Sequence, residues 1–120
     1  MKINRILTYI EQMQESVFLA RSYIEGIEKA DFLADKKTQQ AVVLNLLVLG
    51  ENATKVLQLY PEFSARHDDI PWRSMKGMRN RIAHGYFDIN LDVVWDTATQ
   101  ALPPLSHQLD QLLNHLKQNP

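Results

Sequence analysis

The residues best suited to chemistry gather in one short segment of the chain, positions 66–84. This segment has an excess of three positive charges, from Arg66, Arg73, Lys76, Arg79 and Arg81 against Asp68 and Asp69, and it also holds His67 and His84. The whole chain has a net charge of −1, so its remaining residues are acidic overall. Such a local basic face suits the recognition of one phosphate-bearing segment, although a solvated helix often has a similar composition.

The same segment predicts a helix with one apolar and one polar side. At about 100° per residue, the apolar side collects Trp72, Met75, Met78 and Ile82. The polar side collects Arg73, Lys76, Gly77, Asn80 and His84. Because Asn80 lies one turn before His84, it could contact the same ligand or orient the imidazole ring. Gly77 leaves a notch where a partner helix or a phosphate could come close.

A purely structural interpretation of these residues stays open. His84 would then cap its own helix, and the arginines would pair with neighbouring carboxylates. Those carboxylates are Asp68, Asp69 and Glu51. Glu51 lies in the middle of an expected central helix, where an unpaired charge is costly. It therefore either pairs with Arg79 or Arg81, and so helps to set up a site, or reaches solvent.

The other histidines carry weaker signals. His67 is expected in a solvated loop, with a peripheral phosphate contact as the alternative. His107 and His115 are expected on the surface of the last helix, because neither belongs to a motif with metal-ligand spacing. The chain has no cysteine, which excludes a disulfide framework, a zinc ribbon and a thiol nucleophile. The sequence predicts no metal site.

Composition places the chain among ordinary soluble domains. With 120 residues, of which 45% are hydrophobic and 22% charged, we expect a single domain over residues 1–120. The near-neutral charge argues against a general nucleic-acid coat. The longest apolar stretch, residues 41–49, is far shorter than the ~20 residues that cross a bilayer. The N-terminal segment lacks the uninterrupted apolar run of a signal peptide, so we expect a cytoplasmic protein without a membrane segment.

Four helical patterns and no strand pattern predict an all-α protein. The first pattern spaces apolar residues by three and four over residues 3–27. The second follows Asp31 and Asp35, which suit a helix start, and it ends at Pro61. Between residues 41 and 49 this second helix is apolar on almost all sides. We therefore expect it to be the central helix, surrounded by the others.

The third and fourth helices are predicted from their end signals. Pro71 suits the first turn of the third helix, and Gly85 is expected to stop it in a left-handed conformation. Asn90 is the expected N-cap of the fourth. The two prolines at 103–104 lack amide hydrogens, so this last helix should kink or break near Ala101. The predicted architecture is an up-and-down bundle of about four main helices with a kinked last helix.

One motif resembles that of a known family. The run from Arg79 to Tyr86, Arg-Asn-Arg-Ile-Ala-His-Gly-Tyr, is similar to the signature of the HEPN superfamily in the Arg-x4-His-x-Tyr form of HepT-like toxins. Asp88 and Trp95 after the motif, and Leu-Gly-Glu-Asn-Ala at 49–53 before it, resemble that family in the same order. The resemblance covers essentially the whole chain and includes the all-α architecture.

The resemblance implies an activity. HepT-like proteins are, as a family, metal-independent RNA endonucleases that act as toxins beside a small nucleotidyltransferase antitoxin of the MNT type, in type VII toxin–antitoxin systems. We therefore expect an mRNA or tRNA substrate and no cofactor. Attack of a 2′-OH on the neighbouring phosphate needs a base, an acid and positive charge. One chain has one histidine in the motif, and a homodimer, which the family is described as using, would supply two.

The resemblance also implies roles for single residues. It assigns His84 to proton transfer, Arg79 to binding and stabilising the scissile phosphate, and Asn80 to orientation. Further candidates are Arg73, Lys76 and Arg81 for contacts with RNA, and Glu51 for support of the site. On an ideal helix, however, Arg79 lies about 140° from His84. Either the helix loosens before His84, or Arg79 serves a phosphate held mainly by the other subunit.

Tyr86 has two interpretations. In HepT-like toxins the tyrosine at this place accepts AMP from the antitoxin, and such a transfer would add charge and bulk where RNA enters. Otherwise Tyr86 packs its ring at the loop entrance and bonds through its hydroxyl. Two alternatives remain for the whole protein: a catalytically silent HEPN module that binds nucleotides or its partner protein, and a purely structural helical dimer.

Overall fold

The structure is a computed structural model that describes residues 2–85 and 89–119, with side chains from residue 5 onward in these ranges. The described residues form helices and turns without a strand, so the predicted all-α class is confirmed. The elements are α1 (Lys2–Tyr23), α2 (Lys29–Ala34), α3 (Lys36–Leu59), α4 (Pro61–Arg66), α5 (Trp72–His84), α6 (Leu91–Asp96), the π-helical segment η2 (Thr97–Ala101) and α7 (Leu102–Gln118).

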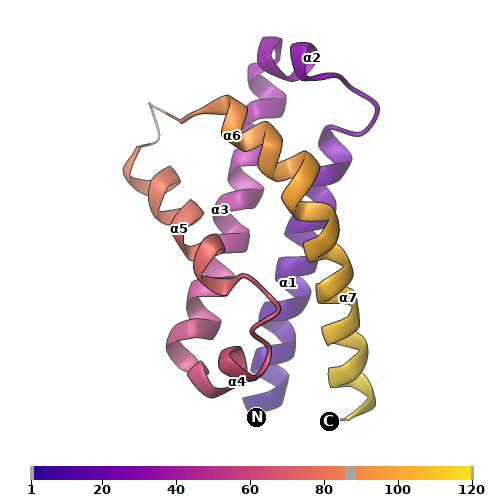
Figure 1. Ribbon diagram of the computed structural model, residues 1–120, viewed down its shortest axis with the longest axis vertical. Coiled ribbons are helices and arrows are strands. Elements are labelled where there is room, and N and C mark those ends of the chain that lie inside the picture. Colours follow the sequence, from indigo (N-terminus) through magenta and orange to yellow (C-terminus); the bar gives the residue numbers. More distant parts are fainter. Residues whose placement is uncertain (1, 86–88, 120) are drawn as a thin grey trace.

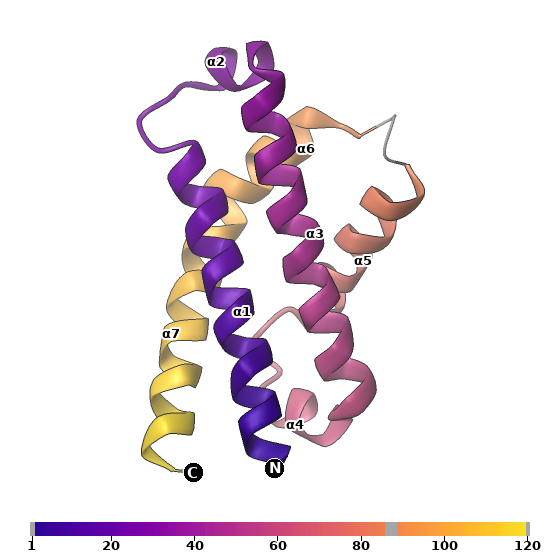
Figure 2. The same ribbon diagram turned by 180° about the vertical axis from the view of Figure 1, so that it is seen from behind.

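The long helices run up and down side by side, as predicted. Helices α1 and α3 are antiparallel neighbours, α7 lies along α1, and α5 lies along α3 on the side away from α7 (Figures 1 and 2). The predicted apolar stripe of α1 is buried at its described positions: Ile6, Ile10, Met13, Val17, Ala20 and Ile24. Helix α3 therefore connects the core of the bundle to α5, the helix that carries the motif.

The connection from α1 to α3 differs from the prediction. Helix α1 ends at Tyr23, before the expected position 27, and Gly26 turns the chain with a φ of 78°, a left-handed conformation that glycine adopts readily. The short helix α2 then forms, which the sequence did not indicate. Asp31 accepts a hydrogen bond from the Glu28 amide at 3.0 Å, and Asp35 is the N-cap of α3. Both aspartates therefore mark helix starts, as expected.

The prediction that other helices surround α3 is wrong on one side. Helices α1 and α5 cover two of its faces, while Leu44 and Val48 remain 57% and 38% exposed. By length and composition alone α3 could cross a membrane, but half of its most apolar window is buried. A core helix has the same properties, so this is weak evidence for a membrane segment. The open side of α3 carries the two exposed apolar residues Leu44 and Val48 and has no neighbouring helix in the described part of the chain.

The last helix is interrupted where the prolines predicted. Asn90 caps α6 through its side-chain oxygen, which accepts bonds from the amides of Asp92 and Val93 at 3.0 and 3.3 Å. The chain then forms the wider π-helical turn η2 before α7 begins. The prolines at 103–104 cannot donate to the carbonyls one turn earlier, so a π-helical turn is found at this place. All three segments pack on the same core, through Val94 in α6, Ala98 in η2 and Leu105 in α7.

Candidate functional site

Helix α5 carries most of the candidate residues and is regular along its whole length. Pro71 is the N-cap and not a residue of the first turn. Gly85 ends the helix as predicted, but with a φ of −130° and not in the left-handed region. Its amide still donates to the Arg81 carbonyl at 2.9 Å, so the helical bonding continues to the end and no left-handed residue is needed. The helix therefore does not loosen before His84.

The predicted division of α5 into two sides is confirmed. Trp72, Met75 and Ile82 are buried in the core, and Met78 is half-buried against it. On the polar side, Arg73 and His84 are exposed, and Lys76 and Asn80 are half-buried. The indole of Trp72 also donates to the His67 carbonyl at 3.0 Å, which fixes the start of α5. The polar side of α5 thus faces solvent on a firmly packed helix.

Gly50 of α3 allows α5 to approach closely. A Cβ at Gly50 would lie 2.7 Å from the carbonyl oxygen of Met75 and would overlap the Cβ of Arg79. A side chain at this position would therefore push α5 away from α3. This role of Gly50 was not predicted, although a lone glycine inside an apolar helix is a signal of close packing.

Glu51 lies beside Gly50 and pairs with Arg79. The Arg79 Nε is 3.2 Å from Glu51 Oε1, and the two side chains are 22% and 52% exposed. Of the two predicted partners, the structure therefore selects Arg79, while Arg81 is exposed. The Nε atom is buried and its N–H is not aligned for a hydrogen bond. Among the described side chains, the terminal amino groups of Arg79 have no hydrogen-bond or ion-pair partner.

Arg79 and His84 do not meet within one chain. Because α5 stays helical through His84, the two side chains remain about 140° apart around its axis. Arg79 faces Glu51 on α3, whereas His84 is exposed, and no described group is bonded to its ring. His84 lies in the last turn of α5, and within residues 5–85 and 89–119 its ring makes no hydrogen bond to the helix, so its role as a cap stays untested. Asn80 makes no hydrogen bond to His84 within residues 5–85.

The basic residues of the first half of α5 border a small pocket. Arg73 and Lys76 line it together with Gln58 and Ser64, and its volume is about 280 Å³. Gly77 lies beside Lys76, and a Cβ there would meet no described atom within 4 Å. The notch predicted at Gly77 is therefore present, with open space beside it.

The remaining candidates are Tyr86, Asp88 and the three histidines outside the motif. Tyr86 and Asp88 lie outside the described residues. His107 and His115 are exposed, as expected, but His67 is not in a solvated loop. It is the half-buried C-cap of α4, and its ring lies 4.6 Å from that of Phe63. Across residues 5–85 and 89–119, no three His, Asp or Glu side chains gather closely enough to hold a metal ion.

An all-α bundle with an Arg-x4-His helix packed on a central apolar helix defines the HEPN class of domains. The sequence model described as Ribonuclease HepT-like matches residues 6–112, and the chain belongs to this family. It is 35% identical over 104 residues to "Probable ribonuclease HepT" of Thermococcus cleftensis, which covers 87% of this chain and 92% of that protein.

The similarity to a second relative covers a similar share of both chains. A protein of Caldanaerobacter subterraneus subsp. tengcongensis, which carries the provisional name of an RNase, is 34% identical over 110 residues, or 91% of this chain and 95% of the relative. No solved structure matches the chain significantly. The two relatives align over almost their whole lengths, so the similarity includes α1, α3, α5 and most of α7.

Proposed function

We propose that this protein is a metal-independent RNA endonuclease that acts as a homodimer and as the toxin of a toxin–antitoxin pair. Membership of the HepT-like family and the names of its relatives support the ribonuclease activity. The observation that carries the proposal is the position of Arg79 and His84 on different sides of one regular helix. A single chain thus presents half of an acid–base site, and a second copy would supply the other half.

The open face of α3 is the surface we assign to the second copy. Leu44 and Val48 lie on this face at the helical spacing that also includes Glu51. Glu51 in turn holds Arg79 at the edge of α5. A copy that buried Leu44 and Val48 would therefore come close to the free amino groups of Arg79. In a two-fold dimer the same contact is made twice, which brings both motifs to one interface.

The chemistry follows from these groups. One His84 takes the proton of a 2′-OH, whose oxygen then attacks the adjacent phosphorus. The bond from phosphorus to the 5′-oxygen breaks, and the partner's His84 gives that oxygen a proton. The products are a 2′,3′-cyclic phosphate and a 5′-hydroxyl. Arg79 stabilises the extra negative charge of the phosphorane through its terminal amino groups, and the ion pair with Glu51 limits the positions these can take.

Arg73 and Lys76 extend the site along α5. They lie on the same side as His84, about 16 and 12 Å from it at 1.5 Å per helical residue. These lengths correspond to two or three nucleotides of a single strand. The notch at Gly77 lies between them and the histidine, and it leaves room for the RNA backbone on this side of α5. We assign Arg73 and Lys76 to phosphates beyond the cleaved one.

The proposal includes control at Tyr86. The tyrosine oxygen would attack the α-phosphorus of ATP on an MNT-type nucleotidyltransferase, the bond to the β-phosphate oxygen would break, and pyrophosphate would leave. Tyr86 follows His84 by two residues, so an attached AMP would add negative charge beside the proton-transfer group and repel RNA. Mass spectrometry after incubation with ATP and the antitoxin should show one adenylyl group on Tyr86 and none on Tyr86→Phe.

Cleavage of cellular RNA and purified tRNA in EDTA tests the activity. The wild-type protein should cut and leave cyclic phosphate ends, while His84→Ala and Arg79→Ala should cut at least about 100-fold more slowly. His107→Ala changes an exposed histidine on α7 and should cut at the wild-type rate. Wild-type cutting by both site variants would refute the assignment. Binding of RNA or nucleotides without cutting, by protein free of AMP, would favour a silent HEPN module.

A further inference from the structure

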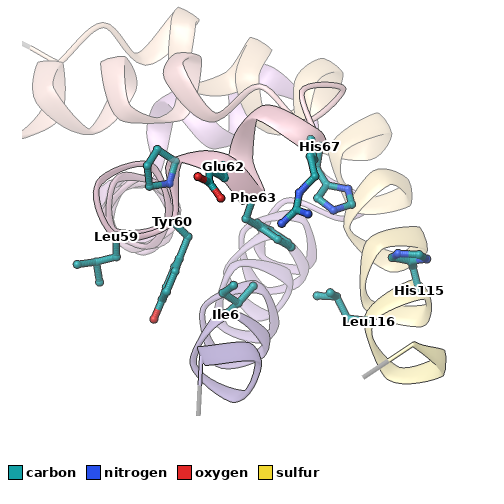
Figure 3. Close-up of a pocket in the computed structure, with 10 residues that line it drawn as sticks. Ile6, Leu59, Tyr60, Glu62, Phe63, His67, His115 and Leu116 are labelled. Carbon is teal, nitrogen blue, oxygen red and sulfur yellow. The ribbon is translucent and has the colours of Figure 1, made fainter.

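A pocket lies at the opposite end of the bundle from η2 and α6. It is formed where the start of α1, helix α4 and the last turn of α7 meet (Figures 1 and 3). Its volume is about 750 Å³, a size that accommodates a small organic molecule. None of its lining residues lies on α5, so the pocket is separate from the site of RNA cleavage proposed above.

The floor of the pocket is apolar and held in place. Figure 3 shows Ile6, Phe63 and Leu116 projecting into the space between α1, α4 and α7. Phe63 is buried and contacts Trp72, with ring centroids 6.3 Å apart. The position of α4 is fixed further by the hydrogen bond from Trp72 to the His67 carbonyl. The floor is therefore held in place by packing within the chain and suits an apolar or aromatic body.

One wall of the pocket carries groups that can be positive. Arg66, His67 and His115 line it, and the rings of His67 and His115 lie 6.1 Å apart. None of these three has an ion-pair partner in the described part of the chain. Glu62 is the one carboxylate among the lining residues, and Asp69 lies close enough to act on His67. At pH values where the imidazoles are protonated, positive charge therefore exceeds negative charge at this wall.

The surroundings of His67 disfavour its protonated form. Burial lowers the pKa of His67 first, and the charges of His115 and Arg66 lower it further, whereas Asp69 raises it. An anion between the two rings would reverse this balance, because it would favour the protonated imidazole. Binding and protonation of His67 should thus support each other.

We infer that this pocket binds a small organic anion, with its aromatic or apolar body on Phe63, Ile6 and Leu116 and its phosphate or carboxylate between Arg66, His67 and His115. Phosphate and carboxylate share the chemistry that these groups recognise, since both accept charge-assisted hydrogen bonds from guanidinium and imidazolium. The size of the pocket limits the ligand to a single small molecule and not a polymer.

Titration with simple probes, followed by NMR of the histidine rings, tests the inference. Phenyl phosphate or benzoate should shift the signals of His67 and His115 in a saturable way and leave His107 unchanged. Binding of benzoate, which stays charged, should tighten as the pH is lowered from about 7.5 and His67 gains its proton. The tighter of the two probes would identify the anionic group. Absence of saturable shifts with both, or equal binding of neutral benzyl alcohol, would overturn the inference.

Matched variants separate this pocket from the rest of the protein. Arg66→Gln and His115→Gln should each weaken binding by about tenfold, the usual effect of losing one charge-assisted hydrogen bond. Both residues are exposed, so circular dichroism should show an unchanged fold. His107→Gln, on the same helix as His115, should bind as the wild type does. Wild-type binding by both Arg66→Gln and His115→Gln would refute the proposed anion contact, whatever the outcome of the RNA cleavage assay.

Discussion

Glu51 on α3 pairs with the Nε atom of Arg79 on α5. The Oε1 atom of Glu51 lies 3.2 Å from that nitrogen, and within residues 5–85 and 89–119 the terminal amino groups of Arg79 have no hydrogen-bond or ion-pair partner. The pair joins α3 to α5 directly beside Gly50, where the two backbones are closest. The orientation of Arg79 therefore depends on α3, although Arg79 belongs to the motif on α5.

Glu51→Gln should slow RNA cleavage with little loss of stability. Glu51 is half-exposed, so the ion pair is expected to contribute less than about 1 kcal/mol to folding. A less restricted Arg79 should lower kcat about tenfold and change KM little. Glu51→Asp, which keeps the charge, should recover part of the rate. Single-turnover kinetics with urea unfolding of each variant measures both effects, and wild-type kcat in Glu51→Gln would exclude a positioning role.

Two glycine substitutions should have opposite effects on stability. Gly50→Ala places a methyl group against the backbone of α5 and should lower the free energy of unfolding by about 1–3 kcal/mol. Gly77→Ala meets open space and should raise it by up to about 1 kcal/mol, because alanine favours the helix. Urea unfolding compares the two. Equal destabilisation by the two substitutions would show that α5 does not pack closely on α3 at Gly50.

Substitution of Arg73 or Lys76 should make RNA binding less dependent on salt concentration. Each charge that neutralises a phosphate of a single strand contributes about 0.7 to the slope of log K against log salt. In a His84→Ala background, which prevents cutting, Arg73→Gln and Lys76→Gln should each reduce the slope by about that amount. Lys117→Gln removes an exposed charge on α7 and serves as the control. An unchanged slope in both α5 variants would remove them from the RNA path.

The fold should lose stability on mild acidification, partly through His67. Burial holds its pKa in the folded chain below the ordinary value near 6.5, so the unfolded chain takes up the proton first. The stability that neutral His67 contributes is fully present above its pKa in the unfolded chain. It is lost as the pH falls from that value through the lower pKa of the folded chain. The difference in unfolding free energy between pH 7.5 and about pH 5.5 should therefore be smaller in His67→Gln than in His107→Gln. The same pH dependence in both variants would contradict this.

The open face of α3 should control the oligomeric state. Leu44→Glu puts a charge on the surface assigned to the second copy and should convert a dimer into a monomer, with loss of RNA cleavage. Leu33→Glu, on α2, changes an exposed leucine elsewhere and should leave both properties intact. Light scattering after size-exclusion chromatography gives the mass. A wild-type monomer with full activity would show that one chain is sufficient for cleavage.

Helix spacing and end signals were enough to predict the bundle. The stripe of α1, the cap at Asn90 and the interruption near Ala101 depend on local rules, and all three are present. The exposure of Leu44 could not be predicted in this way. An apolar residue on a central helix looks the same whether another helix of the chain or a second molecule covers it.

The candidate site was predictable in its residue types and less so in its contacts. The motif identified Arg79 and His84, and the position of Glu51 left two partners open. The choice of Arg79 follows from the crossing point at Gly50, which is a property of the tertiary fold. The half-buried state of His67 was missed because it results from tertiary contact with the ring of Phe63, and a polar connection gives no local signal of such packing.

The attachment of α5 has a consequence for motion. Of the described helices, α3 is the one with which α5 shares an extensive interface, whereas α1 is enclosed by α3 and α7 (Figure 2). A helix that packs mainly on one neighbour can unfold locally as a unit while α1, α3 and α7 stay folded. Amide hydrogens of α5 should therefore exchange with solvent faster than those of α1. Any partner or nucleic acid that covers α5 would slow this exchange, so the segment that carries the motif is also the part of the molecule whose order depends most on being bound.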